Sequence, residues 1–406
     1  MTASRTFRRS ARIASLEISE IVQITERAAS LRAEGRDIVA LSTGEPDFPT
    51  PSHVIEAAHQ AALTGQTKYT ATLGTPELRD LIASQNGVGR ANVIVSTGAK
   101  QVLANAMLAS LDPGDEVVMP APYWTSYSDI VLLAGGSPVV VPATMETGFR
   151  ITPERLEAAI TPRTRWVMLN SPSNPTGAIY AREDLRALAG VLERHPHVMV
   201  LVDEIYDLLS YRDFASMREV VPELSDRMLI VNGVSKAYSM TGWRIGWGIG
   251  PADMIAAMGA VQGQITSGAS SISQAAAVAA LSGPQDILAE RLAILRDRRD
   301  LVVARLNAMP GITCAVPDGA FYVFPDVTGA MAAMGLETCA EFCTELLDRE
   351  GLALVPGRAF GLPGHVRLSF AYSQANLEAG LERLERFLSE VPQTAHCEKP
   401  AERIAS

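Results

Sequence analysis

The chain contains few of the residues that build disulfide or metal sites. Four cysteines occur in 406 residues, with neither metal-ligand spacing nor a convincing pair among Cys314, Cys339, Cys343 and Cys397. The six histidines form no ligand cluster in the sequence either. We therefore expect free thiols in a reducing compartment and no bound metal.

Excess positive charge and long apolar runs are also missing. With 45 acidic against 35 basic residues the net charge is −10, which gives no electrostatic basis for binding nucleic acid. The longest uncharged stretch, Met254 to Gln285, is interrupted by glutamines and serines, so we expect buried helix and loop there and no membrane span. An apolar content of 47% is enough for a large core in more than one domain. A cytoplasmic metabolic enzyme is the plain expectation.

The amino-terminal segment, Met1 to Ser15, has no acidic residue but contains Arg5, Arg8, Arg9 and Arg12. In this respect it is similar to an organellar transit peptide. No apolar segment follows, so a secretion signal is not expected, and we favour a flexible or interface-docking arm at residues 1–15. Residues 391–406 have little apolar periodicity and are expected to be disordered.

The clearest functional signal is the segment from Val234 to Gly246, where Lys236 and Arg244 stand eight residues apart in otherwise uncharged surroundings. Desolvation disfavours an ammonium, so Lys236 is expected to be neutral and able to form an imine with an aldehyde. An arginine fork suits a phosphate dianion. Together the two residues indicate a pyridoxal phosphate site. A surface lysine and a helix-capping arginine are the alternative.

A buried strand from Val198 to Val202 is predicted to deliver Asp203 at its carboxyl end, where open α/β sheets bind ligands. A buried aspartate requires a cation, and a protonated pyridine nitrogen would be one. A helix cap is the alternative role for Asp203. Tyr206 would reach the ring oxygen of the cofactor, and Glu204 is expected to be a solvated neighbour.

Two further segments suit a phosphate and an aromatic ring. A predicted strand from Val93 to Ser96 is followed by a turn at Gly98 and a helix from Val102 to Leu111, so free N–H groups at the helix start would cradle a dianion. Trp124 follows a predicted strand from Glu116 to Met119 and would stack on a planar ring. Each feature also occurs without a ligand, as a crossover turn or a core tryptophan.

A rigid loop follows the predicted strand from Trp166 to Leu169. The loop, Asn170 to Gly177, contains two prolines and a glycine, and Asn174 is held extended by the proline after it, with its amide projecting. An ordinary tight turn would look similar. The joint occurrence of this loop with the other segments is the stronger signal.

At this point the chain resembles a known family, the pyridoxal phosphate-dependent class I aminotransferases, and more closely the bacterial aspartate aminotransferase subgroup. The resemblance extends from Ser15 to Leu388. It rests on the segments above together with Leu41 to Pro51, Lys68 to Thr70 and Gly364 to Ser369. It implies the aspartate aminotransferase-like fold type I, an α/β fold with a large domain of mostly parallel sheet and a smaller α+β domain.

The resemblance also implies roles for the matching residues. Lys236 would bind the aldehyde of pyridoxal 5′-phosphate and move the proton between substrate Cα and cofactor C4′. Asp203 would pair with the pyridine nitrogen. Asn174 and Tyr206 would hold the phenolic oxygen, and Trp124 would stack on the ring. The residues around the phosphate would be Gly98, Ala99, Lys100, Ser235 and Arg244.

Substrate contacts are implied in the same way. Arg367 would clamp the α-carboxylate beside the backbone of Gly44, with Trp124 and Asn174 also at the substrate. Lys100 and Ser19 would approach the distal carboxylate of aspartate or glutamate. The alternatives are a helix cap for Ser19 and a purely phosphate-facing role for Lys100.

Two further points come from relatives. Those that also accept prephenate have a basic residue where this chain has Leu16, so prephenate activity is not expected. A tyrosine matching Tyr69 reaches the phosphate of the neighbouring subunit, which implies a homodimer with shared active sites.

Strand-like runs alternate with helical stretches between residues 93 and 232, which predicts a mostly parallel sheet with helices on both faces. A long charged helix after Arg291 leads into predicted strands at Ala320 to Phe324, Leu352 to Val355 and Val366 to Phe370. We predict a large cofactor domain at residues 52–290 and a small domain formed by residues 16–51 and 291–390.

The implied reaction is a ping-pong transamination, in which an L-amino acid leaves as a 2-oxo acid and a second 2-oxo acid receives the amino group. Aspartate or glutamate is the favoured substrate. One alternative is an aminotransferase for aromatic, alanine or methionine side chains. Another is a β-lyase or an aminocyclopropane carboxylate synthase on the same fold. A non-enzymatic regulator would normally have a fused DNA-binding domain, and the sequence contains none.

Overall fold

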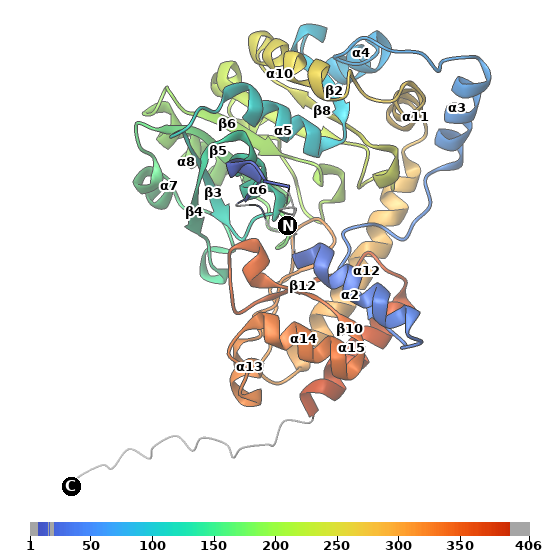
Figure 1. The fold of residues 1–406 in the computed structure, drawn as a ribbon, viewed down its shortest axis with the longest axis vertical. Helices are drawn as coiled ribbons and strands as arrows, with labels where there is room; N and C mark the ends of the chain where they lie inside the picture. Colours follow the sequence, from blue (N-terminus) through green and yellow to red (C-terminus); the bar gives the residue numbers. More distant parts are fainter. Residues whose placement is uncertain (1–6, 15, 17–19, 390–406) are drawn as a thin grey trace, which may run out of the picture.

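The computed structural model describes residues 7–14, 16 and 20–389. Figure 1 shows an upper part built on a large sheet and a lower part built on small sheets. The long helix α12 (Asp286–Ala308) runs between the two parts. The short helix α1 (Ala11–Ala14) lies against α6 (Ser126–Ala134) of the upper part.

The upper part is organised around a seven-stranded sheet of order β2-β8-β7-β6-β5-β3-β4. Neighbours from β7 to β4 are parallel, whereas β8 is antiparallel to both β7 and β2. The predicted mostly parallel sheet is therefore confirmed. The strands are β2 (Val93–Thr97), β3 (Glu116–Ala121), β4 (Ser137–Pro142), β5 (Thr164–Asn170), β6 (Met199–Asp203), β7 (Met228–Gly233) and β8 (Ile245–Ile249).

The central strands are apolar throughout because both faces of the sheet are buried. Ile94 and Leu201 belong to the core on one face, whereas Val93, Val95 and Val200 belong to the core on the other. This alternation follows from the two-residue period of a strand. The first face packs against α5 (Ala99–Ser110), α6 and α10 (Ala252–Ile265), and the second against α4 (Pro76–Gln85), α8 (Arg182–Glu193) and α11 (Ser271–Ser282).

The lower part contains two small sheets. Strand β1 (Val39–Ala40) pairs in parallel with β10 (Leu352–Ala353), which joins an early segment of the chain to a late one. The other sheet is antiparallel, in the order β11 (Val355–Pro356), β12 (Val366–Ser369), β9 (Tyr322–Val323). The surrounding helices are α2 (Glu20–Ala33), α13 (Thr328–Met334), α14 (Cys339–Glu350) and α15 (Gln374–Ser389).

Several predicted elements differ from the observed ones. The predicted strand at residues 352–355 divides into β10 and β11, which belong to different sheets, and the predicted strand at residues 320–324 is limited to β9. Such short strands are defined by their hydrogen-bonding partners, which the local sequence does not reveal. Helix α5 begins at Ala99, earlier than predicted, so Ala99 and Lys100 belong to its first turn. Strand β8 was not predicted.

The described part of the chain contains free cysteines, and it bears on the expected absence of membrane-spanning helices and of metal ligands. Cys314, Cys339 and Cys343 are unpaired and buried, and Cys397 lies outside the described part. The uncharged stretch forms α10 and α11. Among the described helices, none combines the length and apolar character needed to cross a membrane. Within the same residues, no cluster of three or more potential metal ligands occurs.

Candidate active site

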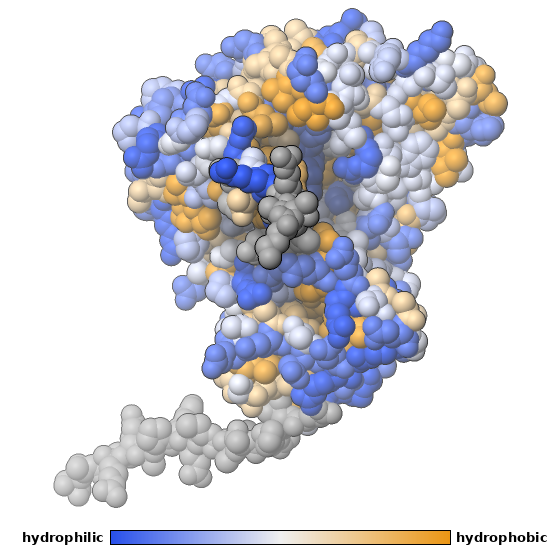
Figure 2. All heavy atoms as spheres, viewed as in Figure 1, coloured by the Kyte–Doolittle hydropathy of each residue, from blue (hydrophilic) through white to orange (hydrophobic). Residues whose placement is uncertain are grey.

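A pocket of about 280 Å³ lies where the carboxyl edge of the large sheet faces the lower part of the chain. Asn170 ends β5, Asp203 ends β6 and Lys236 follows β7, so adjacent strands deliver their side chains to one place. Tyr322 and Arg367 enter from β9 and β12 of the lower part. The space-filling view shows the surface hollowed between the two parts (Figure 2).

Lys236 is held deep in this pocket, and none of the carboxylates in the described residues forms an ion pair with it. Its Nζ donates a hydrogen bond to the backbone oxygen of Gly44 at 2.7 Å. Burial, followed by the positive charge of Arg367, lowers the pKa of Lys236 to about 8. At pH 7 about a tenth of this amine is therefore neutral, far more than for an ordinary lysine, and a neutral amine is a nucleophile and a base.

Asp203 is almost fully buried, with 3% of its surface exposed. Burial raises the pKa of its carboxyl group to about 6, against the opposing effects of a hydrogen bond from Tyr127 and one from the backbone of Ile205. The Tyr127 hydroxyl lies 2.8 Å from Asp203 Oδ2. A carboxylate in such surroundings is suited to pair with a cation inside the pocket.

Arg367 is the opposite case, a buried cation that is 2% exposed. Its Nη1 donates to Asn174 Oδ1 at 3.0 Å and its Nη2 to the backbone oxygen of Ser42, while Nε is buried without a partner in the described part of the chain. No ion pair with Arg367 occurs among the described residues. Since both bonded acceptors are neutral, the guanidinium is poised for an anion that enters the pocket.

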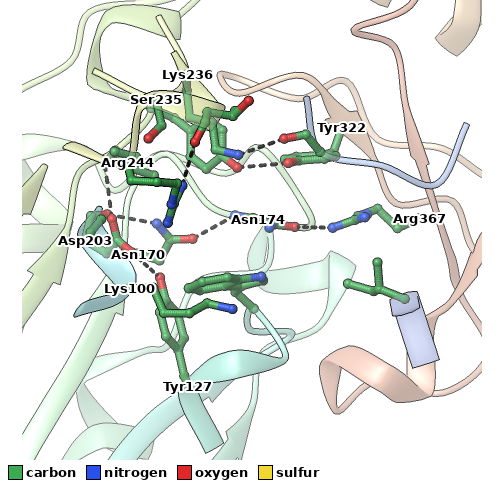
Figure 3. Close-up of a pocket in the computed structure, with 17 residues that line it drawn as sticks. Lys100, Tyr127, Asn170, Asn174, Asp203, Ser235, Lys236, Arg244, Tyr322 and Arg367 are labelled. Atoms are coloured by element: carbon green, nitrogen blue, oxygen red, sulfur yellow. Dashed lines mark hydrogen bonds between the residues drawn. The ribbon is translucent and has the colours of Figure 1, made fainter. Parts of the chain in front are cut away.

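A continuous set of hydrogen bonds leads from the Arg367 guanidinium to the backbone of Asp203 (Figure 3). Arg367 donates to Asn174, the Asn174 backbone N–H donates to Asn170 Oδ1 at 2.8 Å, and Asn170 Nδ2 donates to the Asp203 backbone oxygen at 2.8 Å. The two asparagines thereby fix the orientation of both ends of the site.

The start of α5 forms an anion cradle. Gly98 precedes the helix with φ of 83° and provides no capping side chain, which leaves the first backbone N–H groups of α5 facing the pocket. Gly246 of β8 has no room for a side chain, because an added Cβ would lie 2.2 Å from the Ala99 nitrogen. Arg244 points into the same end of the pocket, held by a hydrogen bond from Nη1 to the Thr241 backbone oxygen at 2.7 Å (Figure 3).

Most of the predicted site residues line this one pocket. They are Gly44, Ala99, Lys100, Trp124, Asn174, Asp203, Tyr206, Ser235, Lys236, Arg244 and Arg367. Gly98 is adjacent, as the residue before α5. Tyr69 lies elsewhere, 96% exposed beside a separate depression that includes Lys68 and Thr70. Ser19 lies outside the described residues.

One prediction about this region is wrong. Glu204 is not a solvated neighbour of Asp203, since it is 4% exposed. Its Oε1 accepts hydrogen bonds from Ser216 Oγ at 2.9 Å and from the Met217 backbone N–H at 3.1 Å. Burial raises the pKa of Glu204 to about 8. The helix α9 (Met217–Val220), which follows a loop, covers this side chain, and local sequence around Glu204 gives no sign of it.

Comparison with known proteins places this geometry in a family. Residues 36–384 match the profile of the family described as "Aminotransferase class I and II". The chain belongs to the class I and II aminotransferase family.

Individual relatives cover nearly the whole chain. The aspartate aminotransferase of Rhizobium meliloti is 52% identical over 391 residues, covering 93% of this chain and 95% of that protein. The aspartate/prephenate aminotransferase of Cereibacter sphaeroides is 50% identical, covering 92% and 97%. The solved structure of the Rhizobium meliloti enzyme has a TM-score of 0.92 at 50% identity and covers 95% of this chain and all of that one. The Thermus thermophilus aspartate aminotransferase with maleate has a TM-score of 0.88 at 41% identity, covering 94% and 100%.

Membership of this aminotransferase family implies pyridoxal phosphate as the cofactor. The residues present fit that group. Asp203 is a buried acid suited to a protonated ring nitrogen, the start of α5 is suited to a phosphate, and Lys236 has an amine suited to an aldehyde.

Six residues that line the pocket were not predicted as site residues: Ile21, Tyr127, Asn170, Ile205, Thr241 and Tyr322. Asn170 ends a strand and opens the proline-rich loop, so its position was a usable signal. Tyr127 lies in the first turn of α6, three residues after Trp124, which precedes the helix, and the two rings meet edge to face with their centres 5.5 Å apart. Tyr322 lies in an apolar run, where only its hydroxyl distinguishes it from a core aromatic residue.

Proposed function

We propose that this chain is an aspartate aminotransferase that uses pyridoxal 5′-phosphate to move the amino group between aspartate or glutamate and a 2-oxo acid. The observation that carries the proposal is that Lys236 shares one pocket with a buried acid, Asp203, and with a buried guanidinium, Arg367, which has no acidic partner in the described part of the chain. A reaction that needs an amine base, an electron-withdrawing cation and a bound carboxylate would use all three.

When bound, the cofactor supplies an aldehyde for the substrate amine and a ring that accepts electrons from substrate Cα. Asp203 would keep the ring nitrogen protonated. Arg367 would hold the α-carboxylate with two parallel hydrogen bonds, which fixes the orientation of the Cα–H bond. Lys236 Nζ would take the proton from substrate Cα, consistent with its lowered pKa.

Selection of an acidic side chain is assigned to Lys100. Its Nζ lies 4.7 Å from the centre of the Trp124 ring and lines the pocket together with Arg244. A second cation at this position would favour a substrate with a distal carboxylate. Leu16 offers no positive charge, so we do not extend the proposal to prephenate.

Three further assignments belong to the proposal. Residues 52–290 would form the cofactor domain, and residues 16–51 would complete the small domain with residues 291–390, supported by the pairing of β1 with β10. The exposed Tyr69 suits a partner subunit, so we propose a homodimer, and sedimentation equilibrium should give twice the chain mass of 43.4 kDa. We also propose a cytoplasmic location, because a metabolic aminotransferase is expected there.

Single half-reactions test the substrate assignment. The cofactor-loaded protein is mixed separately with aspartate, glutamate, alanine, phenylalanine and methionine, and the absorbance change from the aldehyde to the amine form of the cofactor is followed. Fast conversion with aspartate and glutamate alone supports the proposal. Faster conversion with an uncharged side chain removes the role of Lys100, and the absence of conversion with all five removes the aminotransferase assignment.

The variant Lys100→Met separates recognition of the distal carboxylate from transamination itself. Loss of a charged hydrogen bond should slow the half-reaction with aspartate roughly ten- to hundredfold. Alanine has no distal carboxylate and is the matched control substrate, because any damage to phosphate binding would slow both. Equal slowing of aspartate and alanine would contradict a contact with the distal carboxylate.

A further inference from the structure

Tyr322 lines the pocket close to Arg367, Tyr206 and Gly44, and it is 1% exposed. It belongs to β9, where its Cα pairs with that of Ser369 on β12. Arg367 stands two residues from Ser369 on the same strand, and therefore on the same face of the sheet. The register of this small sheet thus sets Tyr322 beside Arg367 (Figure 3).

The ring of Tyr322 forms one wall of a slot for the Arg367 guanidinium. The guanidinium carbon lies 4.7 Å from the centre of the Tyr322 ring and 4.9 Å from the centre of the Phe360 ring. Aromatic faces attract a cation, and a planar cation between two rings has little freedom to rotate. The slot therefore holds the guanidinium of Arg367 in one orientation, although no acid among the described residues pairs with it.

The hydroxyl of Tyr322 reaches the cofactor side of the pocket. It lies 2.9 Å from the hydroxyl of Tyr206, whose ring is in turn 5.9 Å from Lys236 Nζ. If Tyr322 donates, the proton of Tyr206 is free for an oxygen inside the pocket; if Tyr322 accepts, that proton is occupied. The hydrogen bond between the two tyrosines thus decides what Tyr206 offers to a bound group.

The same hydroxyl also lies close to the backbone segment that accepts a hydrogen bond from Lys236. A Cβ on Gly44 would lie 2.2 Å from the Tyr322 oxygen, so only glycine allows this approach. The backbone oxygen of Gly44 accepts the hydrogen bond of Lys236. Tyr322 therefore contacts the Arg367 guanidinium, the Tyr206 hydroxyl and the Gly44 backbone.

We propose that Tyr322 is a positioning residue that couples the carboxylate clamp at Arg367 to the hydrogen-bonding state of Tyr206. The proposal rests on the function given above and extends it, because it assigns two separable tasks to one side chain. The ring orients Arg367 for the substrate carboxylate, and the hydroxyl sets the proton of Tyr206.

Two variants separate these tasks. Tyr322→Phe keeps the ring and removes the hydroxyl, whereas Tyr322→Leu removes both. Binding of maleate, an unreactive dicarboxylate, is measured by calorimetry on the cofactor-loaded protein, and the absorbance of the bound cofactor is titrated with pH. For Tyr322→Phe we expect a maleate Kd within about threefold of the parent, a shifted absorbance titration and a lower kcat at unchanged KM.

Tyr322→Leu should raise the maleate Kd by about tenfold or more, since one face of the guanidinium slot is lost. Tyr211 provides a matched control, because Arg299 stacks on its ring at 4.6 Å and its hydroxyl donates to the Ala320 backbone oxygen at 2.7 Å, outside the pocket. Tyr211→Phe and Tyr211→Leu should leave both the maleate Kd and the absorbance titration unchanged.

Parent-like maleate binding by Tyr322→Leu, or a parent-like titration of Tyr322→Phe, would overturn the proposal. Equal effects at Tyr211 would do the same, because they would indicate general destabilisation. The two levels stay distinguishable: an unmodified protein that neither binds maleate nor reacts with aspartate refutes the proposed function, whereas an active parent with silent Tyr322 variants refutes only the role of Tyr322.

Discussion

Replacing Asp203 with asparagine should stabilise the cofactor-free protein while abolishing transamination. Burial raises the pKa of this carboxyl group from 3.8 to about 6, so the ionised form is disfavoured in the folded state. At about 1.4 kcal/mol per pH unit, this corresponds to a cost of about 3 kcal/mol at neutral pH. Asparagine has the same shape and no charge, and its amide can both donate to the Tyr127 hydroxyl and accept from the backbone N–H of Ile205.

The sign of the pH dependence follows from the raised pKa. The folded state holds the Asp203 proton more tightly than the unfolded state, so stability of the parent falls as pH rises from about 4 to about 6. The advantage of Asp203→Asn should therefore be absent below about pH 4 and complete above about pH 7.

Urea unfolding of cofactor-free protein, followed by circular dichroism at several pH values, measures this difference. The control is Asp297→Asn, an exposed carboxylate on α12, which should change the unfolding free energy by less than about 0.5 kcal/mol. A gain independent of pH, or no gain for Asp203→Asn at neutral pH, would refute burial of the charge as its source. Retained transamination would refute the assigned pairing with the ring nitrogen.

Three other substitutions have defined outcomes. Tyr127→Phe removes a hydrogen bond to Asp203, which should raise the Asp203 pKa and move the acid limb of the kcat/KM profile up by about one to two pH units; an unmoved limb would contradict this. Arg367→Lys replaces a fork by a single point of charge and should raise KM for aspartate roughly tenfold or more in steady-state assays, and an unchanged KM would exclude the clamp. Gly246→Ala should weaken cofactor retention at least about tenfold in equilibrium dialysis, because the added Cβ meets backbone, whereas Gly190→Ala in α8, with open space around its Cβ, should not.

The large sheet was predictable because its central parallel strands, β3, β5, β6 and β7, are largely apolar runs buried on both faces. Strand β8 was missed since its alternating sequence, from Ile245 to Ile249, contains two glycines, which usually weaken a strand. The structure shows why glycine is required at these two positions. Helix α5 approaches so closely that added Cβ atoms would lie 2.2 Å from Ala99 at Gly246 and 2.8 Å from Val102 at Gly248.

The candidate site was predictable to the extent that its residues occur at strand ends or helix starts. Asp203, Lys236 and Arg244 stand in short segments whose composition signals the chemistry. Tyr322 does not, because its role comes from a neighbouring strand and from contacts with residues far away in the chain. The burial of Glu204 was also missed, because the residues that cover it, Ser216 and Met217, follow later in the chain.

The amino-acid sequence by itself determined the parallel strands of the large sheet and the chemical groups delivered at its carboxyl edge, because periodicity and local composition act over a few residues. Only the tertiary structure decided which groups meet. The contact of Lys236 with the Gly44 oxygen and the slot of Tyr322 and Phe360 around Arg367 join segments whose separation along the chain has no bearing on their separation in space. Packing of the lower part against the sheet brings them together, and within the described residues it places Asp203 and Arg367, neither of them ion-paired, in one pocket.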